Sequence, residues 1–308
     1  MKKLLLLVLI VLSIFLGYSF GNPFDKIRED HKVENAKTPL MKIALVADSE
    51  NENELLAKAL RQAQAQNANF VIGLGDWTQT GTIDELLAVK HVFDDSRLGY
   101  NLTAGDHDLW DSRDKGKEAH SNFYSVLGPD IGRFSRKGVN FVIVDNSDIY
   151  KGFPQADWQR LNSLGKDDFG NVLEDRLTFV FAHKTPFHPD SAHIMGEDTP
   201  QVASQAKEFL SLLEGQRVKE TKENTPGVGS PRRFTLKGSD SQGVSKGKPV
   251  DGFFSGDLHF FAKYQSPSGS VKITTIGAVA SERNSQGPRF GILTIYDDYS
   301  WEVEDVGI

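Results

Sequence analysis

The alternation of short apolar runs with helical segments between residues 42 and 103 constrains the fold more than any other feature. Leucines and alanines recur at helical spacing over residues 53–66, and Thr82 with Glu85 forms a capping box that starts a second helix. This strand–helix–strand order predicts a parallel sheet. The apolar runs are KIALVA, NFVIGL and GYNLT, at residues 42–47, 69–74 and 99–103.

The second half of the chain continues the pattern with more strands. Apolar runs at residues 139–144 and 177–182 predict strands, and helices are expected at 155–164 and 201–213. From residue 250 onward the pattern is mostly strands. Strands of both directions with helices outside them predict an α/β fold with mixed sheets.

The first 21 residues differ from the rest of the chain. Lys2 and Lys3 precede an unbroken apolar run at residues 4–12, which is typical of an export signal. One interpretation is a signal peptide cleaved before Asn22, and the other is an uncleaved N-terminal anchor, which would be the protein's one membrane contact. Both predict an exported protein, whether periplasmic, at the cell surface or secreted.

The remaining chain divides into a polar tether at residues 22–40 and a domain at 41–308. An insertion at about residues 218–248 is rich in Gly, Ser, Pro, Lys and Thr and has almost no apolar periodicity. Such a loop is either a surface insertion or a functional segment. In the second case it would be a lid whose Arg232 and Arg233 contact the substrate.

Charge and cysteine content exclude several kinds of protein. The formal net charge is −7, which argues against a nucleic-acid binder that relies on a basic surface. The sequence contains no cysteine, so disulfides, thiolate nucleophiles and thiolate metal sites are excluded. A metal ion would have to bind to His, Asp, Glu or Asn.

Each buried strand is followed by acidic or histidine residues. In open α/β sheets, ligands bind at the carboxyl ends of the strands, so these side chains are expected to converge. Carboxylates so close together repel one another, and a shared divalent cation would remove that repulsion. Each element alone is weak evidence, but the ordered set predicts a metal site. The candidate ligands are Asp48, Glu50, Asp76, Asp106, His183, Asp257 and His259.

The order of these motifs resembles that of the calcineurin-like metallophosphoesterase superfamily. Residues 123–129 and the Gln155, Trp158 and Leu161 positions also resemble stretches of that family. The resemblance implies a four-layer α-β-β-α sandwich with two mixed sheets, of the metallo-dependent phosphatase type. It also implies a binuclear metal centre that hydrolyses phosphate esters. The motifs are Asp48-Ser49-Glu50, Gly75-Asp76, Gly105-Asp106-His107-Asp108, His183 and Gly256-Asp257-Leu258-His259.

The resemblance also implies a role for each residue. Asp76 would bridge two metal ions, and a metal-bridging hydroxide would attack phosphorus. His107 would act as general acid toward the leaving group, with Asp108 holding its imidazole in position. The alternative for His107 is a third metal ligand or a structural histidine. The first ion would be completed by Asp48, Glu50 and His259, and the second by Asp106, His183 and Asp257.

The sequence departs from the family pattern at Glu50, Asp106 and Asp257, where the family has neutral ligands. Five carboxylates carry −5 and two divalent ions carry +4, so the centre would be left at about −1. Oxygen-rich shells favour Mn, Mg or Fe, with Ca or Zn as further options. Gln79 stands where the trivalent-iron enzymes of the superfamily have a tyrosine, which gives that subgroup no support. The alternative function is a metal-binding surface module with little or no hydrolase activity.

Several other residues are left with two interpretations. His188 and His193 are surface histidines or substrate contacts, and Trp77 and Trp110 are core residues or walls of the site. Lys184 and Arg283 would restore positive charge if the fold brought them close. The expected partner is a small-molecule phosphate ester, and neither monoester nor diester is favoured. The sequence gives no oligomeric state.

Overall fold

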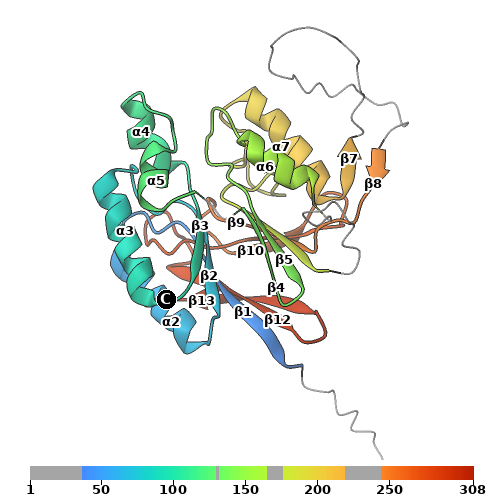
Figure 1. Ribbon diagram of the computed structural model, residues 1–308, viewed down its shortest axis with the longest axis horizontal. Coiled ribbons are helices and arrows are strands. Elements are labelled where there is room, and N and C mark those ends of the chain that lie inside the picture. The colour runs from blue at the N-terminus through green and yellow to red at the C-terminus, as the bar shows by residue number, and fades with distance from the viewer. Residues whose placement is uncertain (1–36, 130–131, 165–175, 219–243) are drawn as a thin grey trace, which may run out of the picture. The chain divides into compact units, whose positions relative to one another are not determined.

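The computed structural model describes residues 37–129, 132–164, 176–218 and 244–308 (Figure 1). The chain divides into two units, residues 1–38 and 39–308, and the second contains every element described below. The predicted signal segment and most of the predicted tether lie outside the described residues. Within the described ranges, no helix is long and apolar enough to cross a membrane.

The first sheet has five strands in the order β13-β12-β1-β2-β3. Its β1, β2 and β3 run parallel, as the strand–helix–strand pattern predicts, and the C-terminal strands β12 and β13 add an antiparallel edge. The bounds are β1 (Pro39–Val46), β2 (Phe70–Leu74), β3 (Tyr100–Thr103), β12 (Arg289–Tyr296) and β13 (Trp301–Gly307).

The second sheet has six strands in the order β10-β11-β9-β6-β5-β4. Its four central strands are parallel, and β10 and β4 are antiparallel edges. The bounds are β4 (Arg133–Arg136), β5 (Val139–Ile143), β6 (Thr178–Ala182), β9 (Gly252–Ser255), β10 (Ala262–Gln265) and β11 (Lys272–Thr275).

The predicted insertion is bounded by a small ribbon. β7 (Gln216–Val218) pairs antiparallel with β8 (Val244–Lys246), so the first and last residues of the insertion are brought together. Arg232 and Arg233 lie outside the described residues, and the prediction of a lid stays a prediction.

The helices α3 and α7 begin at side-chain caps. The predicted capping box is present: the Thr82 hydroxyl accepts from the Glu85 backbone, and the Glu85 carboxylate accepts from the Thr82 backbone. Thr199 caps α7, which has Pro200 in its first turn. The bounds are α2 (Asn53–Ala65), α3 (Ile83–Ser96), α4 (Trp110–Asp114), α5 (Ser121–Val126), α6 (Gln155–Asn162) and α7 (Pro200–Leu213), with a 3-10 turn at His107–Leu109.

The side chains alternate along each strand and so define four layers. Ile43 and Leu45 of β1 pack with Phe179 of β6 in the core between the two sheets. Ala44 of β1 instead joins the core under α2 and α3, and Val180 of β6 joins the core under α6 and α7. The four-layer α-β-β-α sandwich is therefore confirmed, and the parallel strands of both sheets bring their carboxyl ends to the candidate site.

Candidate metal centre

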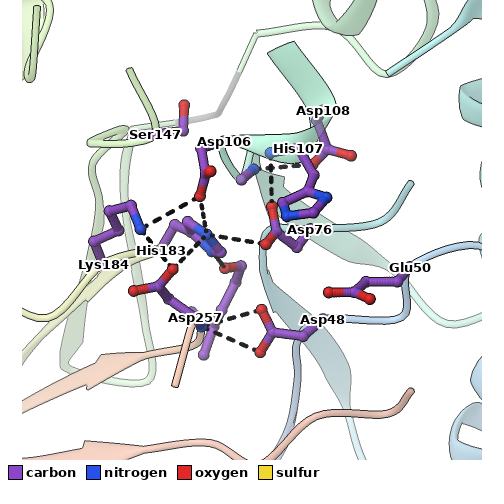
Figure 2. Close-up of polar contacts among 12 residues, drawn as sticks. Asp48, Glu50, Asp76, Asp106, His107, Asp108, Ser147, His183, Lys184 and Asp257 are labelled. Carbon is purple, nitrogen blue, oxygen red and sulfur yellow. Dashed lines mark hydrogen bonds and ion pairs between the residues drawn. The ribbon is translucent and has the colours of Figure 1, made fainter. Parts of the chain in front are cut away.

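The predicted ligands converge from both sheets around Asp76 (Figure 2). Among the residues that the structure describes, three groups of donor atoms form, and within each group the atoms lie within 4.8 Å of one another. Asp76 belongs to all three, which is the position a bridging ligand requires. The groups are Asp76, Asp106, His183 and Asp257; Asp48, Asp76 and His259; and Glu50, Asp76 and His107.

The backbone at these residues is strained. Left-handed φ values are uncommon outside glycine, and in a rigid fold they concentrate at functional sites. Of the eleven non-glycine residues with positive φ in the described chain, five are predicted ligands. These are Asp48 (53°), Glu50 (42°), Asp76 (55°), Asp257 (67°) and His259 (58°).

Two glycines leave room for the ligands. A Cβ on Gly105 would lie 2.0 Å from Oδ1 of Asp76, and a Cβ on Gly75 would lie 2.6 Å from Nδ1 of His183. Gly75 also has a φ of 93°. The glycines before Asp76 and Asp106 are therefore steric requirements of the site.

The three histidines are oriented in the same way, with Nδ1 against a backbone carbonyl. Because a carbonyl oxygen can only accept, Nδ1 carries a proton, and Nε2 is left to bind a metal ion or exchange a proton. This is the usual way that metal-binding histidines are held. The carbonyls are those of Leu74 for His183 (2.7 Å), Glu282 for His259 (3.4 Å) and Gln79 for His107 (3.1 Å).

A buried ammonium lies in the first donor group. Nζ of Lys184 is 2.6 Å from Oδ1 of Asp257 and 3.4 Å from Oδ1 of Asp106 (Figure 2). Nε2 of His183 is 3.3 Å from the same Asp106 oxygen and 3.6 Å from the same Asp257 oxygen. The sequence did not place Lys184 at the centre, and the structure does.

A second cation lies near Glu50, on the other side of Asp76. A guanidinium nitrogen of Arg283 is 2.5 Å from Oε1 of Glu50, and Nε2 of His259 is 3.3 Å from the same oxygen. The Glu50 side chain is buried, whereas 61% of the Arg283 side chain is exposed. Both of the carboxylates Glu50 and Asp257 are thus paired with a basic residue.

Solved structures share this architecture. A dimetal phosphatase from Danio rerio is 15% identical, with 87% of this chain and 96% of that chain covered and a TM-score of 0.55. A purple acid phosphatase from yellow lupin (Lupinus luteus) seeds is 12% identical, with 87% of this chain and 52% of that chain covered and a TM-score of 0.55.

The chain has the calcineurin-like metallophosphoesterase fold. No protein-family model matches the sequence, and no curated protein matches it. At these identities the likeness establishes the fold alone, and the chemistry has to be argued from the site.

The electrostatics of this metallophosphoesterase fold indicate excess negative charge. Burial raises the pKa of Asp48 to about 7, and Asp76 and Asp257 add to the rise although His259 and His183 oppose it. Burial also lowers the pKa of His259, but Glu50 and Asp48 outweigh it and raise that pKa to about 9. A cation is what relieves this repulsion.

Lys184 lowers the pKa of the two carboxylates that it contacts. Burial alone would raise the pKa of Asp257, but the Lys184 charge and His193 lower it to about 2. Burial likewise disfavours charge on Asp106, yet His183 and Lys184 hold its pKa well below the usual range. Both carboxylates are therefore ionised and compensated from within the protein.

The residues at the centre fit a divalent metal ion. Their donors are carboxylate oxygens and imidazole nitrogens, which suit Mn, Mg or Fe. The donors are mostly buried, and backbone carbonyls hold the histidine rings in the orientation that metal binding requires. On the Asp48 side, Asp48 also accepts from the backbone N–H of Asp257 at 3.0 Å, so the two sheets are linked at the site.

The predicted contact between Asp108 and His107 is wrong. The buried Asp108 carboxylate accepts from the backbone N–H groups of Trp77 (3.1 Å), Thr78 (3.0 Å) and Gly105 (2.9 Å). Adjacent residues in a helical turn point in different directions, and Asp108 therefore turns away from the ring of His107. The Gln79 carbonyl takes the place we expected for Asp108.

The remaining candidates separate into core and site. Trp77 is fully buried, as the core interpretation expects, and Trp110 is 37% exposed and stacks on His107 with ring centroids 4.1 Å apart. Nε2 of His193 lies 3.3 Å from Oδ1 of Asp257, so His193 adjoins the centre. His188 packs against Tyr264 instead.

The polar residues that follow β5 also support the site, although they were not among the predicted site residues. Asn146 accepts from the backbone N–H of Lys184 at 2.9 Å and donates to the Lys184 carbonyl at 2.7 Å. Asp145 lies 2.9 Å from Nε2 of the buried His120. Polar residues after an apolar strand were the signal used elsewhere, and the same signal was available here.

Proposed function

We propose that the protein is a metal-dependent hydrolase of small-molecule phosphate esters. The observation that carries the proposal is the position of Asp76, on which two sets of metal donors and the His107 imidazole converge. A bound divalent cation would neutralise charge on the phosphate and supply an activated water for attack on phosphorus. Asp48, Asp76 and His259 would hold such an ion, with Glu50 beside them. We expect Mn, Mg or Fe, because the donors are rich in oxygen.

His107 is proposed to protonate the leaving oxygen. Its Nδ1 is fixed by the Gln79 carbonyl, and its ring stacks on Trp110, so Nε2 is the atom free to deliver a proton. Its donor atom lies within 4.8 Å of Asp76 and Glu50 oxygens, which supports a role beside the metal ion and the phosphate. Asp108 is a positioning residue, since it holds the backbone beside Asp76 and Asp106.

Export is proposed from the first 21 residues alone. A charged start followed by an apolar run supports either a cleaved signal or an anchor. Cell fractionation with mass determination of the mature N-terminus separates the two. Full-length protein in the cytoplasmic fraction would contradict export.

One observation favours the alternative of a metal-binding module with little or no hydrolase activity. Lys184 and Arg283 already pair with Asp257 and Glu50, so a phosphate would meet a centre whose basic groups are engaged. Against this, a binding module has no use for a histidine held as His107 is. The two functions differ in turnover and not in metal binding.

The test is hydrolysis of an aryl phosphate and a bis-aryl phosphate with Mn, Mg, Fe, Ca or Zn added to metal-stripped protein. We expect turnover that requires metal and is lost in Asp76→Asn. Asp95→Asn, which alters an exposed carboxylate of α3, is the matched control and should retain activity. Metal binding without turnover above the Asp76→Asn level would leave the alternative standing.

A further inference from the structure

The Lys184 side chain lies at the centre in a way that the proposed function does not require. Its ammonium contacts the oxygens of Asp257 and Asp106 that also face His183. These three residues, with Asp76, are the whole of the first donor group. A metal ion bound through these two oxygens would have to share them with an ammonium.

The position of Lys184 is fixed by the fold. Its side chain is only 4% exposed, and the carboxylates that it contacts are 3% and 14% exposed. Its backbone N–H and carbonyl both bond to the side chain of Asn146, which follows β5. Because the ammonium is buried against Asp106 and Asp257, moving it away would leave both carboxylates without that charge in a place with little access to water.

The electrostatics oppose two cations here. Like charges repel strongly when water is excluded, and the repulsion grows with the charge of the metal ion. Lys184 also neutralises charge on Asp106 and Asp257 that a second metal ion would otherwise neutralise. The Glu50 side of the centre differs, because the Arg283 side chain is exposed and can turn into solvent when Glu50 binds metal.

We propose that the Lys184 ammonium serves as the second cation of this centre, in place of a second metal ion. One divalent ion then binds tightly, at Asp48, Asp76 and His259, and the Asp106–Asp257 position binds a second ion at least about 100-fold more weakly. This inference rests on the metal centre of the proposed function, but it concerns the number of ions and not the turnover.

The test is calorimetric titration of metal-stripped full-length protein with Mn²⁺. We expect one equivalent for the wild type and two for Lys184→Met, which keeps the length of the side chain and removes its charge. Lys184→Arg keeps the charge and should stay at one. Lys207→Met, an exposed lysine on α7, is the matched control and should also stay at one.

Each outcome decides the proposal. Two equivalents of similar affinity in the wild type, or one in a folded Lys184→Met, would overturn it. If Lys184→Met does not melt cooperatively, the variant is not folded and its titration cannot be used. Anomalous diffraction from wild-type crystals soaked in Mn²⁺ is then the test. A single peak beside Asp48 and His259 supports the proposal, and a second peak beside Asp106 overturns it.

Turnover separates this proposal from the proposed function. A wild type that binds one Mn²⁺ but hydrolyses no ester would overturn the proposed function and support the proposal that Lys184 serves as the second cation. A wild type that binds two Mn²⁺ ions and hydrolyses the ester would overturn the proposed role of Lys184 but not the proposed function. A wild type that binds no Mn²⁺ defeats both.

Discussion

The two sides of Asp76 have similar donors but hold their counter-cations differently. On one side Asp257 pairs with Lys184, whose side chain is 4% exposed. On the other side Glu50 pairs with Arg283, whose side chain is 61% exposed. An exposed arginine can leave its partner for solvent, whereas removing one partner of a fully buried pair costs about 3–5 kcal/mol. Glu50 can therefore exchange its partner for a metal ion at little cost, and Asp257 cannot.

This difference shows that a count of ligand residues does not give a count of metal ions. Both sides contain a carboxylate, a histidine and the shared Asp76. What distinguishes them is whether a cation of the protein already neutralises the carboxylates in a place that water does not reach. The predictions below test that distinction, beginning with the largest expected effect.

The largest effect is expected from the histidines of the two sides. His259→Asn should weaken Mn²⁺ binding by at least about 100-fold and lower kcat by roughly 1,000-fold, because His259 belongs to the side that binds the ion. His183→Asn should weaken Mn²⁺ binding by less than about tenfold, because its side already holds Lys184. Calorimetry and a steady-state assay measure the two effects.

The control for these variants is His91→Asn, an exposed histidine on α3 that should change neither quantity. Equal losses of Mn²⁺ affinity in His259→Asn and His183→Asn would show that the sides are equivalent.

The next effect concerns the proposed proton donor, His107, which forms one donor group with Glu50 and Asp76. His107→Gln should lower kcat by about 100-fold or more for an alkyl phosphate, whose leaving alkoxide needs a proton. For a nitrophenyl phosphate the loss should be less than about tenfold, because nitrophenolate leaves without protonation. Mn²⁺ affinity should not change. Equal losses for both substrates would rule out a general-acid role for His107.

A smaller effect is expected at the exposed pair. Arg283→Met should strengthen Mn²⁺ binding by a few-fold, because the guanidinium no longer competes with the metal ion for Glu50. The number of Mn²⁺ equivalents should stay unchanged, in contrast to Lys184→Met. A dye-competition assay measures the affinity, and Arg61→Met on α2 is an exposed control. A gain of a second equivalent in Arg283→Met would mean that the exposed side, and not the buried one, is blocked.

The sequence was sufficient to predict much of the fold and most of the candidate site. Strand-end aspartates are predictable because parallel strands carry them to one edge, and both Asp48 and Asp76 lie there. The family resemblance supplied the four layers, which apolar periodicity alone could not. The roles of the candidate residues in catalysis stay predictions.

Side-chain pairing could not be predicted from the sequence. Lys184 reaches Asp257 across 73 positions, and Arg283 reaches Glu50 across 233, so no local pattern links them. The backbone N–H groups that Asp108 accepts from were not predicted for a different reason. They depend on the direction that the 3-10 turn gives to neighbouring side chains. Local chemistry was therefore predictable, and long-range charge compensation was not.

The last effect concerns the stability of the loop that supports the buried side, and not metal binding. His120 is buried beside Asp145, just before Asn146, which holds the Lys184 backbone. Burial lowers the pKa of His120, but Asp145 and Glu118 outweigh it and raise that pKa to about 9. Because the folded pKa lies above the unfolded value of about 6.5, the pair stabilises the fold fully below pH 6.5. That stability is lost as pH rises through about 9.

Asp145 sets the lower limit of the same window. Burial would raise its pKa, but His120 and Ser147 hold that pKa below the ordinary value, so its contribution is present above about pH 4 and is lost as pH falls through the lowered pKa. Between pH 6.5 and 9, metal-free wild type should lose about 2 kcal/mol of unfolding free energy relative to His120→Gln. Urea unfolding across this range measures the difference, with His91→Gln as control. Parallel curves for the wild type and His120→Gln would mean that the loop carrying Asn146 is held by packing alone, and that the fixed position of Lys184 does not depend on this ion pair.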